Sequence, residues 1–401
     1  MSSTSQSSAA QYGAAQFGAA QSSAAQNSAP TGRSELRRIR VESVMGALLS
    51  TGPISRTDLA AVTGYSPSTV TGIVQELQGM GYLHEVGHRE STGGRRRTLV
   101  ELDRTAIALI VAEVSGGRIR ASLIDLDARV LATQDAPFDP ADPVSATALA
   151  VAGLGEPTGH RPSRLILALP GVVAADGTVS LAPAFAAAGD PQLAQALARR
   201  TGLPVTVEND VNLIALGERS AGAAAGVDDL VLIHIAEGIG ATILSGGRLL
   251  HGSTRSAGEV GFLPIGLTPL PHGNRGSFEE RWSTPAIAAA ARTAGLDVSE
   301  ANVIPRLCSE PAAAALRTEV LDAWAWAAVV CACVLNPALV LFSGDAIGLD
   351  DDARTGLADR IRSAAPAAPE VTFASLGVEA VLFGAVARVL EDPASLITPA
   401  G

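Results

Sequence analysis

Residues 53–83 read PISRTDLAAVTGYSPSTVTGIVQELQGMGYL, and this stretch predicts two short helices joined by a tight turn. Ser55 can cap the first helix, and Gly64 follows that helix at a position that needs a positive φ. Ser66 can cap the second helix, and Pro67 occupies its first position, where the missing N–H costs nothing. Both helices therefore have defined ends.

The second helix of this pair is amphipathic. Its apolar residues recur at i, i+3, i+4 and i+7 and predict a face directed at a core: Val70, Ile73, Val74 and Leu77. The opposite face carries side chains that are small or polar enough to enter a DNA groove: Ser68, Thr69, Thr71, Gly72 and Gln75. This pattern is typical of a helix-turn-helix whose second helix reads base edges. The alternative is a helix pair from an ordinary bundle.

Two short strands are expected directly after the pair, at 82–86 and 99–102, around the Gly- and Arg-rich loop 87–97. Two strands around such a loop form a wing, and arginines beside glycines suit the DNA backbone or a narrow minor groove. A solvated charge cluster or a linker is the alternative for the arginine run. The predicted DNA-contacting residues are Ser66, Ser68, Thr69, Thr71, Gln75, Arg95, Arg96 and Arg97.

A further helix is expected ahead of the pair, at residues 34–50, with its apolar residues near one face: Leu36, Val41, Val44, Met45 and Leu48. It would complete a winged helix-turn-helix domain at 34–102. Residues 1–33 are rich in Ser, Ala and Gln and carry the imperfect repeat QYGAAQFGAAQ. Low complexity without core-forming residues predicts a disordered tail.

The composition supports a DNA-reading module attached to a larger globular body. The chain has 401 residues, 47% hydrophobic and 17% charged, with a net charge of −11. That net charge argues against a general nucleic-acid binder, yet residues 33–104 hold ten arginines against eight acidic residues. Three cysteines, with no signal peptide and no uncharged apolar run of about 18 residues, predict a cytoplasmic protein without a membrane span.

Residues 103–397 form the second expected domain, in which strands and helices alternate around glycine-rich turns. This alternation predicts an α/β architecture with mixed sheets. The expected strands are 107–113, 118–125, 165–169, 205–207, 230–235, 241–244, 339–342 and 371–374. The expected helices are 143–153, 190–201, 211–222, 284–294, 311–335, 350–363 and 377–390.

Four motifs of this domain occur in a characteristic order: Ala168–Thr178, Val207–Asn212 with Gly217-Glu218, Glu237–Ala241, and Gly252 followed by Ala257–Gly261. Together they resemble the ROK family of repressors, open reading frames and sugar kinases, over about residues 105–395. The resemblance implies a two-lobed actin-like fold. The winged head, including Ser91–Arg95, is similar to that of the family's repressor branch.

The resemblance also implies a set of sugar-binding residues. They are Asn209, Asp210, Glu259 and Glu279. In the kinases the matching Asp is the base that takes a proton from the sugar hydroxyl. Carboxylates and amides can accept from and donate to the many hydroxyls of a sugar ring. A helix cap is the structural alternative for the Asn209-Asp210 pair.

Departures from the family pattern argue against kinase activity and make Asp210 a vestigial base. The phosphate-binding Asp-x-Gly-Gly-Thr loop of the kinases is replaced by Glu113–Arg118, EVSGGR. Glu237 stands where the kinases have a small uncharged residue, and its charge would repel a triphosphate. Asp210 remains as the argument for the alternative, an ATP-dependent sugar kinase.

The family's zinc site is also changed. Its four ligand positions are occupied by Phe262, Leu270, His272 and Ser277. One ligand of four cannot hold a structural tetrahedral zinc, so we expect no zinc and no other cofactor.

These observations predict a transcriptional regulator, in the first instance a repressor, that binds a double-stranded DNA operator as a homodimer or a dimer of dimers. Its effector would be a sugar or sugar phosphate held between the lobes. Helix residues 320–335 would supply dimer contacts or, alternatively, buried core. A DNA-binding protein that senses no ligand is the remaining alternative, because Phe262 replaces a sugar-contacting His of the family.

Overall fold

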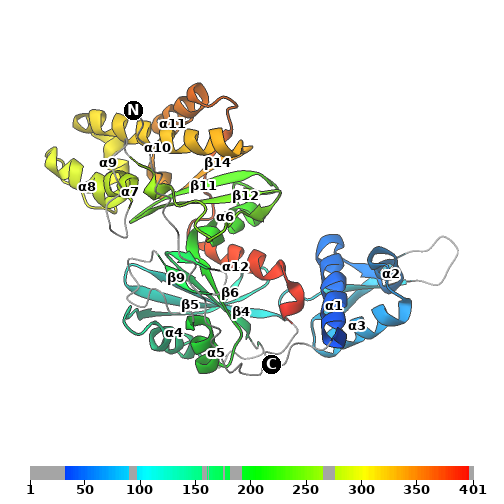
Figure 1. The fold of residues 1–401 in the computed structure, drawn as a ribbon. Helices are drawn as coiled ribbons and strands as arrows, with labels where there is room; N and C mark the ends of the chain where they lie inside the picture. The colour runs from blue at the N-terminus through cyan, green and yellow to red at the C-terminus, as the bar shows by residue number, and fades with distance from the viewer. Residues whose placement is uncertain are drawn as a thin grey trace, which may run out of the picture.

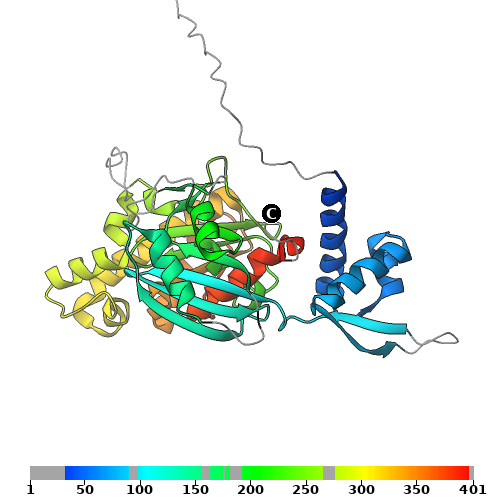
Figure 2. The ribbon, with the colours of Figure 1, turned by 90° about the horizontal axis from the view of Figure 1, so that it is seen from below.

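The computed structural model describes residues 32–89, 97–155, 160, 162–174, 177–180, 192–264 and 276–396. It contains a small N-terminal head and a body of two lobes, each lobe built on a five-stranded sheet. The head lies to one side of the body, beside the C-terminal helix (Figures 1 and 2). Residues 1–31 of the expected tail lie outside the described residues.

The head has the three predicted helices and the two predicted wing strands, together with a short strand, β1, that was not predicted. Its helices are α1 (Gly32–Thr51), α2 (Arg56–Thr63) and α3 (Pro67–Gly79), and its strands are β1 (Ile54–Ser55), β2 (Leu83–Arg89) and β3 (Arg97–Leu102). The strands pair antiparallel in the order β1-β3-β2. Ser55 accepts a hydrogen bond from the Asp58 backbone N–H at 3.1 Å, and Gly64 has a φ of 72°. The predicted caps therefore end α2 where the sequence places them.

The core of the head is made by the apolar faces of its three helices and by β3: Val41, Val44, Met45, Leu48, Leu59, Val70, Ile73, Val74, Leu77 and Val100. The prediction was wrong for one residue of the apolar face of α1. Leu36 is 55% exposed, because it lies on the first turns of α1, which extend beyond the rest of the head.

Lobe 1, the first lobe of the body, has the strand order β10-β7-β4-β5-β6. Its strands are β4 (Ala108–Ser115), β5 (Arg118–Asp125), β6 (Val130–Pro137), β7 (Pro162–Leu169) and β10 (Val205–Asn209). Helices α4 (Pro143–Ala152) and α5 (Leu193–Thr201) cover one face of this sheet. Strand β4 alternates between two cores, since Ile110 packs on the α4–α5 side and Leu109 on the other.

Lobe 2 repeats the plan, with the order β13-β12-β11-β14-β15. Its strands are β11 (Leu230–Ile235), β12 (Ile239–Ser245), β13 (Arg248–Leu249), β14 (Leu339–Gly344) and β15 (Glu370–Phe373). The outer face is covered by α7 (Ser277–Trp282), α8 (Thr284–Thr293), α9 (Val303–Ser309), α10 (Ala314–Leu335) and α11 (Asp351–Ala364). The predicted two-lobed α/β fold is confirmed; the short helices α7 and α9 were not predicted.

Two helices form the layer between the lobes: α6 (Asp210–Ala221) and α12 (Ala380–Leu390). They approach closely because glycines stand at their contacts. A Cβ on Gly217 would lie 2.0 Å from the Ala380 carbonyl oxygen, and one on Gly384 would lie 1.8 Å from that of Leu213. Any larger residue at either position would force the helices apart.

The segment Pro311–Leu335, which includes α10, is long and apolar enough to cross a membrane by length and composition. The fold gives it another place. Trp324, Ala328 and Cys331 are buried in the core of lobe 2, together with residues of α8, α9 and α11. It is a core helix of this lobe.

Candidate functional site

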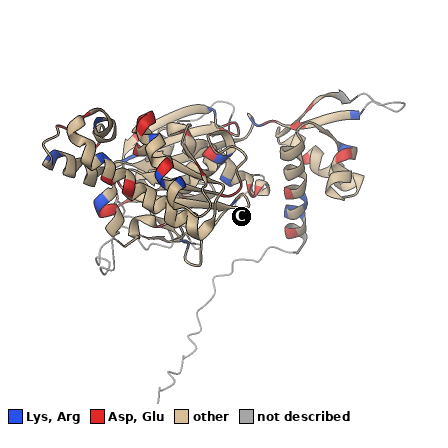
Figure 3. Cartoon of the chain, turned by 90° about the horizontal axis from the view of Figure 1, so that it is seen from above, with Lys and Arg blue, Asp and Glu red and all other residues tan. Residues whose placement is uncertain are grey.

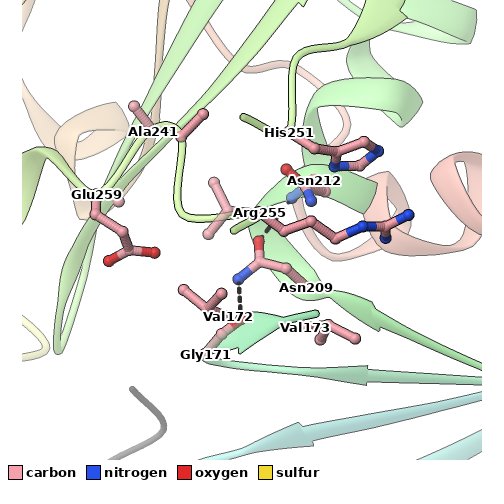
Figure 4. A pocket seen from close by; sticks show the side chains of 12 residues that line it. Gly171, Val172, Val173, Asn209, Asn212, Ala241, His251, Arg255 and Glu259 are labelled. Atoms are coloured by element: carbon pink, nitrogen blue, oxygen red, sulfur yellow. Dashed lines mark hydrogen bonds between the residues drawn. The ribbon is translucent and has the colours of Figure 1, made fainter. Parts of the chain in front are cut away.

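A pocket opens between the lobes where β10 of lobe 1 meets α6. Its lining comes from this junction, from the turn after β7, from β12 of lobe 2 and from the segment after β13: Gly171, Val172, Val173, Asn209, Val211, Asn212, Gly240, Ala241, His251, Arg255, Ala257 and Glu259. Figure 4 shows these side chains around one space, with Asn209 near its centre. We call this space the cleft.

Asn209 is both the last residue of β10 and the N-cap of α6. Its Oδ1 accepts from the Asn212 backbone N–H at 2.9 Å, and its Nδ2 donates to the Gly171 carbonyl at 2.8 Å. The capping alternative raised by the sequence is thus realised. These bonds also hold the amide rigidly at the cleft, where its remaining hydrogen-bonding capacity is available to a ligand.

Asp210, the first residue of α6, is half-buried beside the cleft. Burial raises the pKa of this carboxyl, and the nearby His234 opposes that shift. Burial lowers the pKa of His234, whose Nδ1 lies 3.0 Å from the Ser343 hydroxyl. His234 could not be predicted from the sequence, because an isolated histidine within a strand has no motif around it.

Three further carboxyl groups lie in this region of the protein. Burial raises the pKa of Glu259 to about 7, assisted by the negative charges of Glu279 and Asp210. Burial also raises the pKa of Glu113, and Asp210 adds to that effect. Glu279 accepts a hydrogen bond from the Ile239 backbone N–H at 3.0 Å and does not line the cleft. Glu259 is therefore the carboxyl group that lines the cleft, with other acidic side chains behind it.

The opposite side of the cleft carries two basic residues that the sequence reasoning missed, His251 and Arg255. Both belong to the segment after β13, between motifs that were recognised, and neither is part of one. Burial lowers the pKa of His251, and the neighbouring positive charge of Arg255 lowers it further. Asn212 was quoted within a motif but not assigned; its amide donates to Glu208 at 3.0 Å and accepts from Thr242 at 2.9 Å.

The structure brings Asn209 and Glu259 of the expected sugar-binding set into one pocket, with Asp210 and Glu279 in their electrostatic surroundings. Of the changed zinc positions, Leu270 and His272 lie outside the described residues. Among the residues that are described, no group of three or more His, Cys, Asp or Glu side chains could hold a metal ion.

The predicted recognition helix α3 has an exposed outer face, although some of its hydroxyls are already engaged. Ser66 caps the helix by accepting from the Thr69 backbone N–H at 3.2 Å. The Thr71 hydroxyl donates to the Pro67 carbonyl at 2.7 Å. Ser68 and Gln75 are exposed. Roles in reading bases stay predictions for all five residues, with Ser66 also a structural cap.

Acidic residues of the head pair with its arginines, as the interleaved charges on α1 show in Figure 3. Arg97 pairs with Asp58 at 3.0 Å, Arg56 with Glu85 at 3.2 Å, and Arg37 with Glu76 of α3. Arg95 and Arg96 lie outside the described residues. These three guanidinium groups are therefore already engaged within the head.

The head is connected to the cleft through the C-terminal segment. Arg38 of α1 lies 3.5 Å from Asp392, just before the turn η5 (Pro393–Leu396), against which α1 packs. Arg388 of α12 donates to Glu208 at 3.0 Å, next to Asn209. The buried Glu218 of α6 accepts from the backbone N–H groups of Ser375 and Leu376 before α12. A continuous set of contacts therefore runs from Asn209 to α1.

Comparison with known proteins agrees with this architecture. The model of the ROK family matches residues 110–392. The xylose repressor of Bacillus subtilis strain 168 is 24% identical over 277 residues, covering 67% of this chain and 72% of that protein. The DNA-binding transcriptional dual regulator NagC of Escherichia coli K12 is 29% identical over 221 residues, which cover 53% of this chain and 54% of that protein.

A solved structure shares the fold of head and body together. The crystal structure of a ROK family transcriptional regulator, a homologue of the E. coli Mlc protein, superimposes with a TM-score of 0.76. It is 24% identical and covers 90% of this chain and 98% of its own. The matched region of this chain is therefore larger than the body alone.

Proposed function

Since the chain belongs to the ROK family, we propose that it is a DNA-binding transcriptional repressor whose operator binding is changed by a sugar or sugar derivative in the cleft. The observation that carries the proposal is the contact path from Asn209 through Arg388 and the C-terminal segment to α1 of the head. A ligand that changes the separation of the lobes acts directly on α6 and α12, because these helices lie between them.

The head would bind DNA through α3 in the major groove and through the wing at the backbone. As a homodimer, the protein would present two heads to half-sites about one helical turn apart. The exposed outer face of α3 supports this role, and so do the relatives that are named as a repressor and as a DNA-binding transcriptional dual regulator.

The acidic side of the cleft supports ligand sensing without phosphoryl transfer. Glu113 and Asp210 lie close enough to raise the pKa of Glu113, so an anionic triphosphate would meet negative charge there. Asp210 keeps the position of the kinase base, which makes an ATP-dependent sugar kinase the second candidate. Incubation with ATP and a panel of hexoses and amino sugars tests it; we expect no turnover above background.

Mobility-shift assays with DNA from around the protein's own gene test the main proposal. We expect binding that survives excess competitor DNA and changes in the presence of one sugar of a panel. Binding that is indifferent to sequence and is lost at moderate salt would contradict an operator-reading function. Sequence-selective binding that no sugar changes would identify a ligand-blind DNA-binding protein.

A further inference from the structure

The two sides of the cleft differ in their ionisable groups. Glu259 lies on one side of it, Arg255 and His251 lie on the other, and Asn209 stands between them (Figure 4). A neutral sugar needs only groups that accept from and donate to hydroxyls, and Asn209 with Glu259 supplies both. A guanidinium can also donate to hydroxyls, but its charge and its planar set of donors match an anionic group better than a neutral one.

Arg255 is held in the cleft by an unusual backbone. Its φ is 61°, in the left-handed region that residues other than glycine rarely adopt. Such conformations persist where the surrounding structure imposes them, and they concentrate at ligand sites. Among the residues that the structure describes, no carboxylate forms an ion pair with Arg255. Arginines of the head and of α12 do form such pairs.

A half-buried guanidinium between two lobes favours an anion. Its planar donors match the oxygens of a phosphate or a carboxylate, and partial removal from water strengthens the attraction. The nearby His251 adds a ring nitrogen on the same side, and the paired charges of Arg388 and Glu208 act on it in opposite directions. Arg388 itself is paired with Glu208, so Arg255 is the cation left for a ligand.

We propose that the ligand of the cleft is an anionic sugar derivative, whose phosphate or carboxylate group binds Arg255 beside His251 while its hydroxyls bind Asn209 and Glu259. This inference rests on the proposed function, because it names the chemical class of the effector. It also sets a direction for the ligand, with the charged group toward the segment after β13 and the ring toward the acidic side.

Isothermal titration calorimetry on the full-length protein tests the ligand class. The probes are common hexoses, pentoses and N-acetylhexosamines, each offered as the neutral sugar, as its phosphate ester and, where it exists, as its uronic acid. We expect at least one charged member to bind ten or more times tighter than its neutral parent. The phosphate and uronic acid arms distinguish the two sources of charge.

Variants of Arg255 test the residue. Arg255→Gln should weaken binding of the charged sugar at least tenfold and leave the neutral parent within twofold, whereas Arg255→Lys should lose less. Arg248→Gln, at an exposed arginine of β13, is the matched control and should change neither affinity. Thermal unfolding of each variant verifies that it is folded.

Two results separate the failure of this inference from the failure of the proposed function. A neutral sugar that binds as tightly as its charged derivatives, or an Arg255→Gln variant that weakens both forms equally, overturns the anionic class while sugar sensing stands. Absence of binding by every carbohydrate of the panel overturns sugar sensing itself.

Discussion

Arg388 donates a hydrogen bond to Glu208 at 3.0 Å, and the Glu208 side chain is only 2% exposed. Glu208 directly precedes Asn209, and its other oxygen accepts from the Asn209 backbone N–H at 3.1 Å. One buried carboxylate thus ties the cleft to α12, the helix that leads to the head. A buried charge that loses its partner is costly, so this pair holds α12 in a defined position against β10.

Removing the Arg388 charge should destabilise the protein and weaken the link to the head. We expect Arg388→Met to lower the free energy of unfolding by about 3 kcal/mol, because Glu208 would remain buried without its cation. Arg360→Met, which breaks an exposed pair with Asp322, should cost less than about 1 kcal/mol. Urea unfolding measures both, and equal losses would show that burial of Glu208 is not the cause.

The contact between α6 and α12 should tolerate no side chain at Gly384. A Cβ there would lie 1.8 Å from the Leu213 carbonyl oxygen, so Gly384→Ala should cost about 1–3 kcal/mol or more and displace α12. Gly46→Ala is the matched control, since a Cβ at that exposed helical position meets no atom within 4 Å. It should stabilise by up to about 1 kcal/mol. Unchanged melting of Gly384→Ala would contradict the close packing.

Two residues of α3 that the sequence assigns to DNA should behave differently on mutation. Ser66 caps the helix, so Ser66→Ala should lower the free energy of unfolding by about 1 kcal/mol. Gln75 is exposed, so Gln75→Ala should leave unfolding unchanged and weaken operator binding by about 1–3 kcal/mol. Denaturation and fluorescence anisotropy with operator DNA separate the two effects. Full operator affinity of Gln75→Ala would remove this residue from the reading face.

Arg97 should contribute to DNA affinity without contributing to sequence preference. If it binds a phosphate, Arg97→Ala will reduce the slope of log K against log salt by about 1 and weaken all DNA sequences alike. Arg120→Ala, at an exposed arginine of lobe 1 that pairs with Asp135 at 2.9 Å, should change neither quantity. A salt slope equal to that of the unmodified protein would place Arg97 away from the backbone.

The raised pKa of Glu259 should make stability fall as pH rises. Its pKa is about 7 in the folded protein against an ordinary value of 4.5, so folding favours the protonated form. The stabilisation is complete below about pH 4.5 and is lost as pH rises from there through 7, at about 1.4 kcal/mol for each pH unit. Glu259→Gln cannot ionise and should show a shallower decline between pH 5 and 8. Chemical denaturation at a series of pH values measures both proteins. Parallel profiles of unfolding free energy against pH for the unmodified protein and Glu259→Gln would contradict the raised pKa.

Local signals in the sequence determined the head and most of the secondary structure. Caps, a glycine stop and a 3.6-residue apolar period act within a few residues of the chain, so Ser55, Gly64 and Val70–Leu77 predict α2 and α3 without knowledge of distant contacts. The order of four motifs likewise indicated the family and placed Asn209 and Glu259 in one cleft. The same local reasoning wrongly placed Leu36 in the core, because only the packing of α1 against the rest of the head determines which of its apolar residues are buried.

Only the tertiary structure decided the charge of the cleft and its connection to the head. His251, Arg255 and Glu259 come from one segment of lobe 2, and they meet Asn209 only because lobe 2 folds over the β10–α6 junction, an encounter between segments with no shared periodicity. Arg388 meets Glu208, 180 residues earlier, for the same reason. Whether a charged side chain is paired, buried or free depends on which distant segment packs beside it. The residues next to it in the sequence do not determine that packing.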